Sequence, residues 1–337
     1  MADLPFPKSL PEFQKLFPDD TACATYLERI HWREQFVCAC GWTGEPYRFK
    51  AKPWVLRCRS CQADTSLTAG TVMHRTRTPL STWFWASYLV TTMTTGMSAV
   101  QFQRQLGLTR HETAFQILHK LRAGMVRPDQ DRIGGKGTEH VEIDETWIGG
   151  RTRGEGRGVH HQSLVVGAVE VRTRKPKDLP SQHSKAVPRR GGRYAGRLRL
   201  AVAPNRQAKT LQAFITQAVE PRTMVVTDGW GGYEGIAKLS YQHLQAVEGD
   251  DPEVAEEYLP IIHLVFSNLK TWLNGTYHGV APQHLQAYLN EFTFRFNRRF
   301  YPFNSFRSLL GIAADVEAPT YDSLYQGTWH HPWALAV

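Results

Sequence analysis

The stretch TEHVEIDETWIGG, residues 138–150, decides the fold that this sequence predicts. Val141 and Ile143 alternate with two acidic residues, Glu142 and Asp144, which is the two-residue period of a half-buried β-strand. The two glycines that end the stretch predict a tight turn into a second strand. Asp144 is thereby held on a rigid strand, where a carboxylate is costly to bury unless a cation or a hydrogen-bond donor satisfies it. The position therefore predicts a metal or a polar partner.

Four later segments predict that this strand belongs to a mixed α/β domain. They are two strand-like runs, 164–171 (LVVGAVEV) and 198–202 (LRLAV), a helix over 209–219, and a buried strand, 223–227 (TMVVT), that ends at Asp228. Three sequential strands, a helix and another strand make a mixed sheet in which the fourth strand lies beside the first. We therefore expect Asp144 and Asp228 to lie side by side.

A helix after Pro260 offers further chemical groups, and Asn274-Gly275 predicts its end. At about 100° per residue, one face of this helix is apolar and predicts the core. Its members are Ile262, Val265, Phe266, Leu269 and Leu273. His263 and Lys270 stand nearly two whole turns apart and point the same way, whereas Asn268 points away from both. One helix face thus carries an imidazole that can bind a metal and an ammonium group.

Composition limits the class of protein. The chain has 337 residues, with 40 Lys and Arg against 31 Asp and Glu, a formal net charge of +9. This balance favours a polyanionic partner or an anionic membrane surface. The longest apolar runs are far shorter than the roughly 18–20 residues of a transmembrane helix, and residues 1–8 lack the apolar core of a secretory signal. We expect a cytoplasmic protein without a membrane segment.

Four of the five cysteines lie close together in the sequence and predict a Zn²⁺ site. CACGW (38–42) and CRSC (58–61) are two cysteine pairs joined by a short aromatic stretch, the form of a zinc ribbon. The predicted ligands are Cys38, Cys40, Cys58 and Cys61. The first pair is C-x-C, shorter than the usual C-x2-C, so a decayed ribbon or ordinary buried thiols is the alternative. Cys23 is expected to be a small core residue.

Residues 81–125 have helical periodicity and predict a helix-turn-helix. Gly107 breaks the pattern, and Thr109 with Glu112 predicts the capping box of the second helix. The basic balance of the chain favours DNA as the partner. The candidate contacts are Arg110, His111 and Lys120. A plain helical hairpin within a bundle is the alternative interpretation.

Basic residues also gather elsewhere. The Pro- and Gly-rich segment 172–197 contains Lys175, Lys177, Lys185, Arg189, Arg190 and Arg193. It is either a solvated loop or a basic finger that holds a phosphate backbone. The aromatic residues of 284–299 stand at helical spacing and predict core, while three arginines of that segment are candidate DNA contacts. These are Arg295, Arg298 and Arg299.

Several long motifs resemble one family, the DDE-type transposases of bacterial insertion sequences, in particular the ISXO-like group with an N-terminal zinc ribbon. The resemblance covers most of the chain. After the ribbon it is carried by TAGTVMHRT (68–76), PLSTWFWASYLV (79–90), SAVQFQRQLGLTRHETAFQILHKLR (98–122), IDETWIGG (143–150), TDGWGGY (227–233), and SNLKTWLNGTYHGV with HLQAYLNEFTFRFNRR within 267–299.

The resemblance implies a ribonuclease-H-like catalytic domain, a mixed sheet flanked by helices. Asp144 matches the first family aspartate and Asp228 the second. The third residue of the family, often Glu, stands seven positions before a Lys, and counting back from Lys270 gives His263. Some members use Asn in this role, and Asn268 is the nearest Asn here, although the helix geometry favours His263.

The implied cofactor of this site is a pair of Mg²⁺ ions about 4 Å apart. A neutral imidazole is a poorer ligand for Mg²⁺ than a carboxylate and shifts the preference toward Mn²⁺. Lys270 would bind a DNA phosphate. Glu256 and Glu257 are expected to be a solvated acidic segment.

Two functions remain open at this point. The first is an active transposase that binds the terminal inverted repeats of an insertion sequence and catalyses metal-dependent DNA cleavage and strand transfer. Its partners would be double-stranded repeat and target DNA, with a homodimer or higher oligomer of the chain. The second is a catalytically inactive, transposase-derived DNA-binding protein, for which His263 and the C-x-C pair are the evidence.

The expected domain order is an N-terminal helix with the zinc ribbon, a helix-turn-helix, a linker, a catalytic domain and a tail. The corresponding ranges are 1–78, 79–127, 128–137, 138–310 and 311–337.

Overall fold

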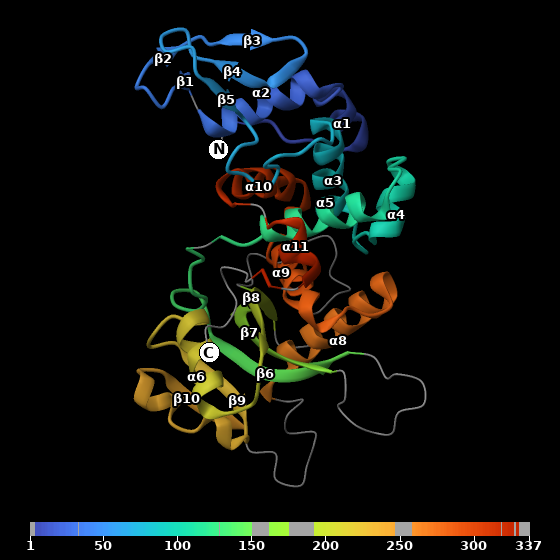
Figure 1. The fold of residues 1–337 in the computed structure, drawn as a ribbon. Helices are drawn as coiled ribbons and strands as arrows, with labels where there is room; N and C mark the ends of the chain where they lie inside the picture. The colour runs from blue at the N-terminus through green and yellow to red at the C-terminus, as the bar shows by residue number, and fades with distance from the viewer. Residues whose placement is uncertain are drawn as a thin grey trace, which may run out of the picture. The chain divides into compact units, whose positions relative to one another are not determined.

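The computed structural model describes residues 4–32, 34–127, 129–149, 162–174, 192–246, 258–317, 319–326 and 328–329. The chain divides into two compact units (Figure 1). One unit combines Met1–Arg127 with Arg298–His331, and the described residues of the other lie within Pro128–Asn297. This division differs from the expected one, in which the catalytic domain extends to residue 310. The chain leaves the second unit at Asn297, and the segment that follows packs with the N-terminal residues.

The second unit contains a five-stranded mixed sheet. Its strands are β6 (His140–Ile148), β7 (Ser163–Thr173), β8 (Arg193–Ala203), β9 (Met224–Asp228) and β10 (Gln242–Ala246). They are ordered β10-β9-β6-β7-β8, with antiparallel pairing from β6 to β8 and parallel pairing from β6 to β10. The fourth strand of the unit thus lies beside the first, as predicted. This arrangement is compatible with a ribonuclease-H-like sheet.

Two details of the sheet differ from the prediction. Ile148 pairs with Ser163, so residues 149–162 connect the first two strands and the predicted tight Gly-Gly turn is wrong. Strand β10 was not predicted, because its alternating pattern QHLQA contains few apolar residues. Its backbone pairs with β9 along the whole length, from Gln242 opposite Met224 to Ala246 opposite Asp228. Backbone pairing of this kind leaves little trace in the side-chain pattern.

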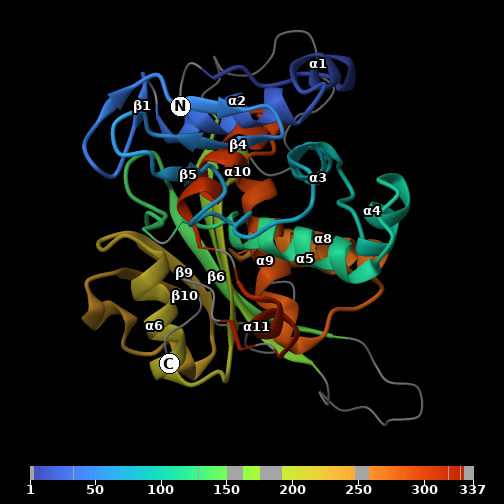
Figure 2. The same cartoon turned by 45° about the horizontal axis from the view of Figure 1, so that its top comes forward.

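Helices flank the sheet on two sides. They are α6 (Ala208–Ala218), α8 (Pro260–Tyr277) and α9 (Leu285–Asn297). Figures 1 and 2 show α6 on one side of the strands and α8 with α9 on the other. Helix α8 contacts β6 and β7, and α9 contacts β8. No helix in the described ranges is both long enough and apolar enough to cross a membrane.

The predicted apolar face of α8 is confirmed. All five of its members are at least 96% buried and lie in one hydrophobic cluster with β7, β8 and α9. Gly167, which pairs with Asp144, permits this close packing, because a Cβ there would lie 2.9 Å from the ring of Phe266. The helix continues past Asn274-Gly275 to Tyr277, so its predicted end is wrong. The left-handed residue that ends it is His278, at φ 57°.

In the described residues, the first unit consists of two N-terminal helices, the ribbon and five further helices. Its helices are α1 (Leu10–Leu16), α2 (Asp20–His31), α3 (Leu80–Thr92), α4 (Ala99–Gln105), α5 (His111–Ala123), α10 (Pro302–Asp315) and α11 (Tyr321–Gln326). The strands of the ribbon are β1 (Phe36–Val37), β2 (Thr43–Gly44), β3 (Tyr47–Phe49), β4 (Lys52–Arg57) and β5 (Asp64–Ser66). Cys23 is fully buried, as predicted.

An aromatic cluster forms the core of this unit, and α10 completes it. Phe306 of α10 lies 5.9 Å from Phe13, 5.5 Å from Phe17 and 6.0 Å from Phe84, measured between ring centroids. Phe13, Phe84 and Phe306 are fully buried. A segment that the sequence assigned partly to the catalytic domain and partly to a tail therefore belongs to the N-terminal core.

Candidate active site and metal centre

Asp144 and Asp228 lie on neighbouring parallel strands. Glu142 of β6 lies opposite Val226 of β9. Continuing this register by two residues places Asp144 level with Asp228, and side chains at matched positions project from the same face. Asp144 is 14% exposed, and Asp228 is also partly exposed at the end of its strand. The sheet thus presents two neighbouring carboxylates that solvent can reach.

His263 joins the first of these carboxylates. Its Nε2 lies 3.3 Å from Asp144 Oδ2, and the imidazole is 36% exposed. The side chain that fixes this approach is Glu142, which the sequence analysis did not single out. Its Oε2 accepts the backbone N–H groups of Ile261 (2.8 Å) and Ile262 (2.7 Å) at the start of α8.

Glu142 therefore acts as the N-terminal cap of a helix more than a hundred positions away in the sequence. Its carboxylate is 1% exposed and satisfies N–H groups that a helix start leaves without an intrahelical acceptor. Glu142 and Asp144 project from the same face of β6, so the strand that carries the candidate ligand also holds the helix that carries His263. In the sequence, the sign of this capping role was an acidic residue two positions before Asp144, on the same face of the strand.

Lys270 and Asn268 lie further along α8, and both are exposed. Lys270 follows His263 by almost two turns and shares its side of the helix, whereas Asn268 projects about 140° away from His263. The structure therefore brings His263 to Asp144 and leaves Lys270 accessible to a ligand on the same side.

A second polar cluster supports the opposite side of β6, and sequence reasoning missed it. Glu145 is 2% exposed, and its carboxylate accepts hydrogen bonds from Arg206 and from the hydroxyl of Tyr233. Burial raises the pKa of Glu145, although the Tyr233 and Arg206 contacts act in the other direction. The guanidinium of Arg206 lies 4.3 Å from the ring centroid of Trp230, whose backbone N–H donates to Asp228 Oδ1 at 3.1 Å. The cluster thus connects Glu145 to the loop that holds Asp228.

The four cysteines of the ribbon converge. The distance from Cys38 Sγ to Cys61 Sγ is 3.6 Å and that from Cys40 Sγ to Cys58 Sγ is 3.8 Å, and all four sulfur atoms lie within 4.8 Å of one another. A tetrahedron of thiolates about 2.3 Å from Zn²⁺ has edges of about 3.8 Å, so the spacing fits this ion. Burial opposes ionisation of Cys58, but donors that include the N–H groups of Cys61 and Ser60 outweigh it, and the pKa is lowered to about 7.

The short C-x-C pair forms a regular turn. Cys58 starts its turn by accepting the N–H of Gln62 through its carbonyl, and Gln62 is left-handed at φ 62°. Cys38 accepts the N–H of Gly41 in the same way, and Gly41 has φ 86°. The first turn is therefore one residue shorter, with glycine at the left-handed position. This explains how C-x-C brings its two sulfur atoms together.

Helices α4 and α5 form where the helix-turn-helix was predicted, but the predicted cap is wrong. Helix α5 begins at His111, and the residue at its N-cap is Arg110, with no side-chain hydrogen bond to the helix. Arg110 and His111 are exposed at this start, as a DNA contact requires. Lys120 is half-buried, and burial lowers its pKa. Of the three candidate contacts, Arg110 and His111 are thus exposed and Lys120 is half-buried.

The three arginines near the end of α9 do not form an exposed basic group. Arg295 is 14% exposed and its guanidinium lies 3.3 Å from Glu291. Burial lowers the pKa of Arg298 to about 10. The guanidinium of Arg299 lies over the ring of Phe300, 4.4 Å from its centroid. The expectation that Arg295 and Arg298 touch DNA is therefore not supported by their burial.

Comparison with known proteins finds a family that the second unit resembles. Residues 136–297 match the model of the ISXO2-like transposase domain. This part of the chain is therefore similar to ISXO2-like transposases, and we refer to it as the transposase domain. An uncharacterized transposase-like protein of Haemophilus influenzae is 27% identical over 96 residues, which are 28% of this chain and 77% of that protein. No solved structure matches the chain.

Within the transposase domain, the acidic residues near the site differ in availability. Glu142 caps α8 and Glu145 holds Arg206 and Tyr233, so neither is available to a metal. Asp144, Asp228 and His263 remain, an oxygen, oxygen and nitrogen donor set that suits a divalent ion. In the described part of the chain, only the four cysteines form a group of three or more such side chains with all donor atoms within 4.8 Å. The three residues of the transposase domain are thus more widely spaced than the ribbon ligands.

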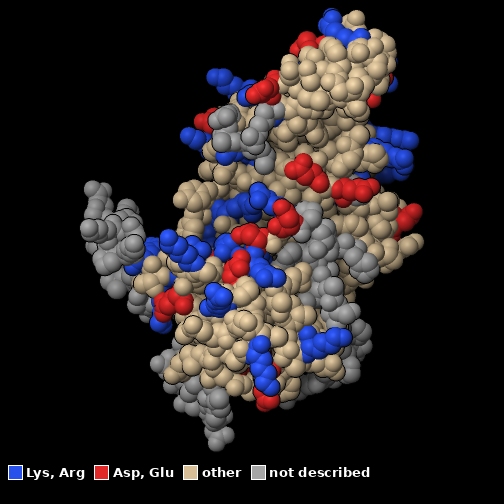
Figure 3. Space-filling view, turned by 90° about the vertical axis from the view of Figure 1, so that its left-hand side faces the viewer, with Lys and Arg blue, Asp and Glu red and all other residues tan. Residues whose placement is uncertain are grey.

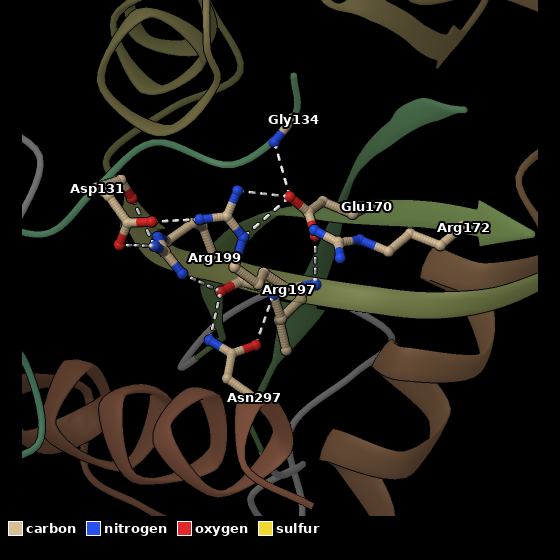
Figure 4. Close-up of polar contacts among 8 residues, drawn as sticks. Asp131, Gly134, Glu170, Arg172, Arg197, Arg199 and Asn297 are labelled. Atoms are coloured by element: carbon tan, nitrogen blue, oxygen red, sulfur yellow. Dashed lines mark hydrogen bonds and ion pairs between the residues drawn. The ribbon is translucent and has the colours of Figure 1, made fainter. Parts of the chain in front are cut away.

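The arginines that border the basic segment of the transposase domain are engaged with carboxylates (Figure 4). Glu170 of β7 is fully buried and accepts from the backbone and side chain of Arg197, from Gly134 N and from Arg172. Burial acts to raise the pKa of Glu170, but these donors outweigh the effect of burial, and the pKa is lowered. Arg193 pairs with Glu139 at 2.6 Å. The remaining basic residues named above, from Lys175 to Arg190, lie outside the described residues, as do Glu256 and Glu257.

The space-filling view shows how charge is distributed on one face. Lys and Arg side chains are interspersed with Asp and Glu over the described residues of the face in Figure 3. Charge alone therefore does not mark a DNA-binding surface on this face, in spite of the net charge of +9.

Proposed function

We propose that the protein is an insertion-sequence transposase that binds terminal inverted repeats and catalyses metal-dependent DNA cleavage and strand transfer. The observation that carries this proposal is the geometry of the transposase domain. Continuing the β6–β9 register by two residues brings Asp144 level with Asp228, and His263 Nε2 lies 3.3 Å from Asp144 Oδ2. Carboxylates on two neighbouring core strands, joined by a third ligand from a following helix, are suited to binding divalent ions.

In this proposal Asp144, Asp228 and His263 hold Mg²⁺ or Mn²⁺. A bound pair of such ions activates a water or a DNA 3′-hydroxyl and stabilises the leaving oxygen in phosphodiester cleavage. Lys270, exposed on the His263 side of α8, binds a phosphate of the DNA. Glu142 and Glu145 position these groups by holding the start of α8 and the loop after β9. Asn268 is the alternative third ligand.

The first unit supplies DNA binding in this proposal. The ribbon sulfur atoms have the spacing of a Zn²⁺ site, and a ribbon of this size depends on its metal to fold. Arg110 and His111 are exposed at the start of α5 and are the candidate contacts to terminal-repeat DNA. The net charge of +9 favours a polyanionic partner. The catalytically inactive alternative is motivated by His263, because DDE enzymes usually carry a carboxylate at the third position.

Substitution of the two aspartates tests the proposal. Asp144→Asn and Asp228→Asn each remove a metal-binding charge with little change in side-chain shape. We expect each to reduce cleavage and strand transfer by roughly 100-fold or more, since even outer-shell partners of a metal ligand typically contribute 10- to 100-fold. The measurement is a strand-transfer assay on labelled DNA that carries the repeats flanking the gene, with Mg²⁺ and with Mn²⁺.

The matched control is Glu139→Gln, an exposed acid immediately before β6, which should retain activity. End binding, measured separately, should stay nearly intact in both aspartate variants. A wild-type protein that binds its repeats but is inert with either metal would favour the inactive alternative. Full activity in both aspartate variants would overturn the assignment of the site.

A further inference from the structure

Trp230 is an exposed aromatic residue beside the candidate metal ligands, and the mechanism above does not use it. It stands two positions after Asp228, and 44% of its surface is exposed. Solvent exposure of a large indole is costly relative to burial, and nearby Tyr233 of the same TDGWGGY motif is fully buried. The exposure of Trp230 therefore needs an explanation.

The indole is held in place by several independent contacts. Its Nε1–H donates to the carbonyl of Arg206 at 3.1 Å, and its backbone N–H donates to Asp228 Oδ1 at 3.1 Å. The guanidinium of Arg206 covers one face of the ring, 4.3 Å from the centroid. Gly232 is also required, because a Cβ there would lie 2.6 Å from Trp230 Nε1 and 2.7 Å from the Arg206 carbonyl oxygen.

Arg206 is in turn fixed by a buried acid. Its guanidinium pairs with Glu145, whose carboxylate is 2% exposed and also accepts the Tyr233 hydroxyl. The charge of Arg206 is therefore already engaged, so this residue acts as a support for the ring. One face of Trp230 is covered by this support, and its exposed surface is rigid and pre-oriented. A rigid aromatic surface binds a planar ligand with little loss of conformational entropy.

We propose that Trp230 is a stacking platform for an unpaired DNA base next to the phosphate held at Asp144 and Asp228. Any nucleic acid base presents a π-face, so stacking on an indole tolerates sequence, and Arg206 beneath the ring contributes a cation–π contact. The backbone N–H of Trp230 donates to Asp228 Oδ1, so the platform lies beside one of the proposed metal ligands. This inference rests on the proposed function, since it names the form of DNA that the same site binds.

The stacking platform is tested by the fluorescence of a DNA base analogue bound to the full-length protein. The probe is a short duplex of the terminal repeat with 2-aminopurine at the unpaired end of the strand that is cut, in Ca²⁺ so that no bond is broken. Stacking on the indole should quench the fluorescence. Replacing the base by an abasic site should weaken binding roughly 5- to 150-fold, the range that base–aromatic stacking covers.

Three variants give the experiment its controls. Trp230→Ala should lose both the quenching and the preference for a base over an abasic site. Trp230→Phe also removes the indole N–H but keeps an aromatic face, so it should retain both in part. Trp147→Ala removes an indole of similar exposure from β6 and should behave as wild type.

The outcomes separate this inference from the proposed function. Quenching that persists unchanged in Trp230→Ala, in a protein that prefers its repeat over random DNA, would overturn the platform and leave the transposase proposal standing. Equal loss in Trp230→Phe and Trp230→Ala would also overturn it, because it would assign the effect to the hydrogen bond of the loop. Failure of wild type to distinguish its repeat from random DNA would instead count against the proposed function.

Discussion

The imidazole of His263 and the carboxylate of Asp144 share one corner of the transposase domain, 3.3 Å apart. A nitrogen donor therefore stands where a hard oxygen donor would suit Mg²⁺ best. Mn²⁺ accepts imidazole more readily, so under the proposed function this one side chain sets the preference between the two ions. The geometry of α8 favours His263 over Asn268 as the proposed third ligand, because Asn268 projects about 140° away from His263 around the helix.

A set of single substitutions at the residue scale identifies the third ligand. We expect His263→Ala to lose strand transfer and His263→Glu to retain or raise the Mg²⁺-dependent rate, because the carboxylate restores an oxygen ligand. Asn268→Ala should remain active. The rates are measured with Mg²⁺ and Mn²⁺ in parallel, and wild type should be the more active with Mn²⁺. An inactive Asn268→Ala together with an active His263→Ala would make Asn268 the third ligand.

At the scale of elements, α8 is placed by a carboxylate from β6. Glu142 accepts two backbone N–H groups at the start of the helix, and the negative charge also complements the positive end of the helix dipole. Gly167 on β7 then allows Phe266 to pack directly on the sheet. The cap and the close packing together bring His263 within reach of Asp144.

Removal of this cap should affect both stability and activity. Glu142→Ala leaves two buried N–H groups without an acceptor, and we expect it to lower the free energy of unfolding by about 2–3 kcal/mol, since hydrogen bonds to charged groups contribute about 1.5–3 kcal/mol. The matched control is Glu139→Ala, whose partly exposed pair with Arg193 should contribute about 1 kcal/mol or less. Denaturant unfolding measures both. Equal effects of the two substitutions would contradict the role of Glu142.

The ribbon is a second part of the structure whose fold depends on a few side chains. Its strands are short, from two to six residues, and its sulfur atoms have the spacing of a zinc tetrahedron. We expect about one Zn²⁺ per chain, lost in Cys58→Ala together with the ribbon fold. Cys23→Ala, which removes a buried cysteine of α2, should keep the metal. Elemental analysis of the purified proteins measures the zinc content per chain. Full zinc retention in Cys58→Ala would rule out the site.

At the scale of the whole molecule, the described part of the chain passes between its two units twice, after Arg127 and after Asn297. Both passages are anchored to β8 within the transposase domain. Arg197 pairs with Asp131 near the first passage, and Asn297 at the second accepts the N–H of Leu198 at 2.7 Å and donates to its carbonyl (Figure 4). A single strand therefore holds the chain where it enters and leaves the domain.

Because residues after Asn297 belong to the N-terminal unit, we expect that this unit cannot be isolated by ending the chain at residue 127. Phe306 is fully buried in its aromatic core, and Phe306→Ala should lower the free energy of unfolding of this unit by about 3–5 kcal/mol. A fragment of residues 1–127 should unfold without cooperativity. The control is Phe300→Ala, whose ring is 54% exposed and should change stability by no more than about 0.5 kcal/mol. Circular dichroism during thermal unfolding measures the three proteins, and a cooperative transition of the fragment would contradict the role of α10.

The sequence by itself determined the features that depend on neighbours along the chain. The alternation around Asp144, the helical face of Ile262 to Leu273 and the paired cysteines follow from periods of two to four residues. The neighbouring placement of the strands that carry Asp144 and Asp228 also followed, because the order of strands and helix along the chain restricts the possible topologies. These features located the candidate ligands Asp144, Asp228 and His263.

Tertiary structure alone decided which distant groups meet. The cap that Glu142 gives to α8, the support that Glu145 gives to Arg206 and Tyr233, and the insertion of Phe306 into the N-terminal core each join segments far apart in the chain. A buried acid in a strand pattern looks the same whether its partner is a metal, an arginine or a helix start. Its role is fixed only when folding supplies that partner, because the energy of burying a charge depends on the donors that surround it.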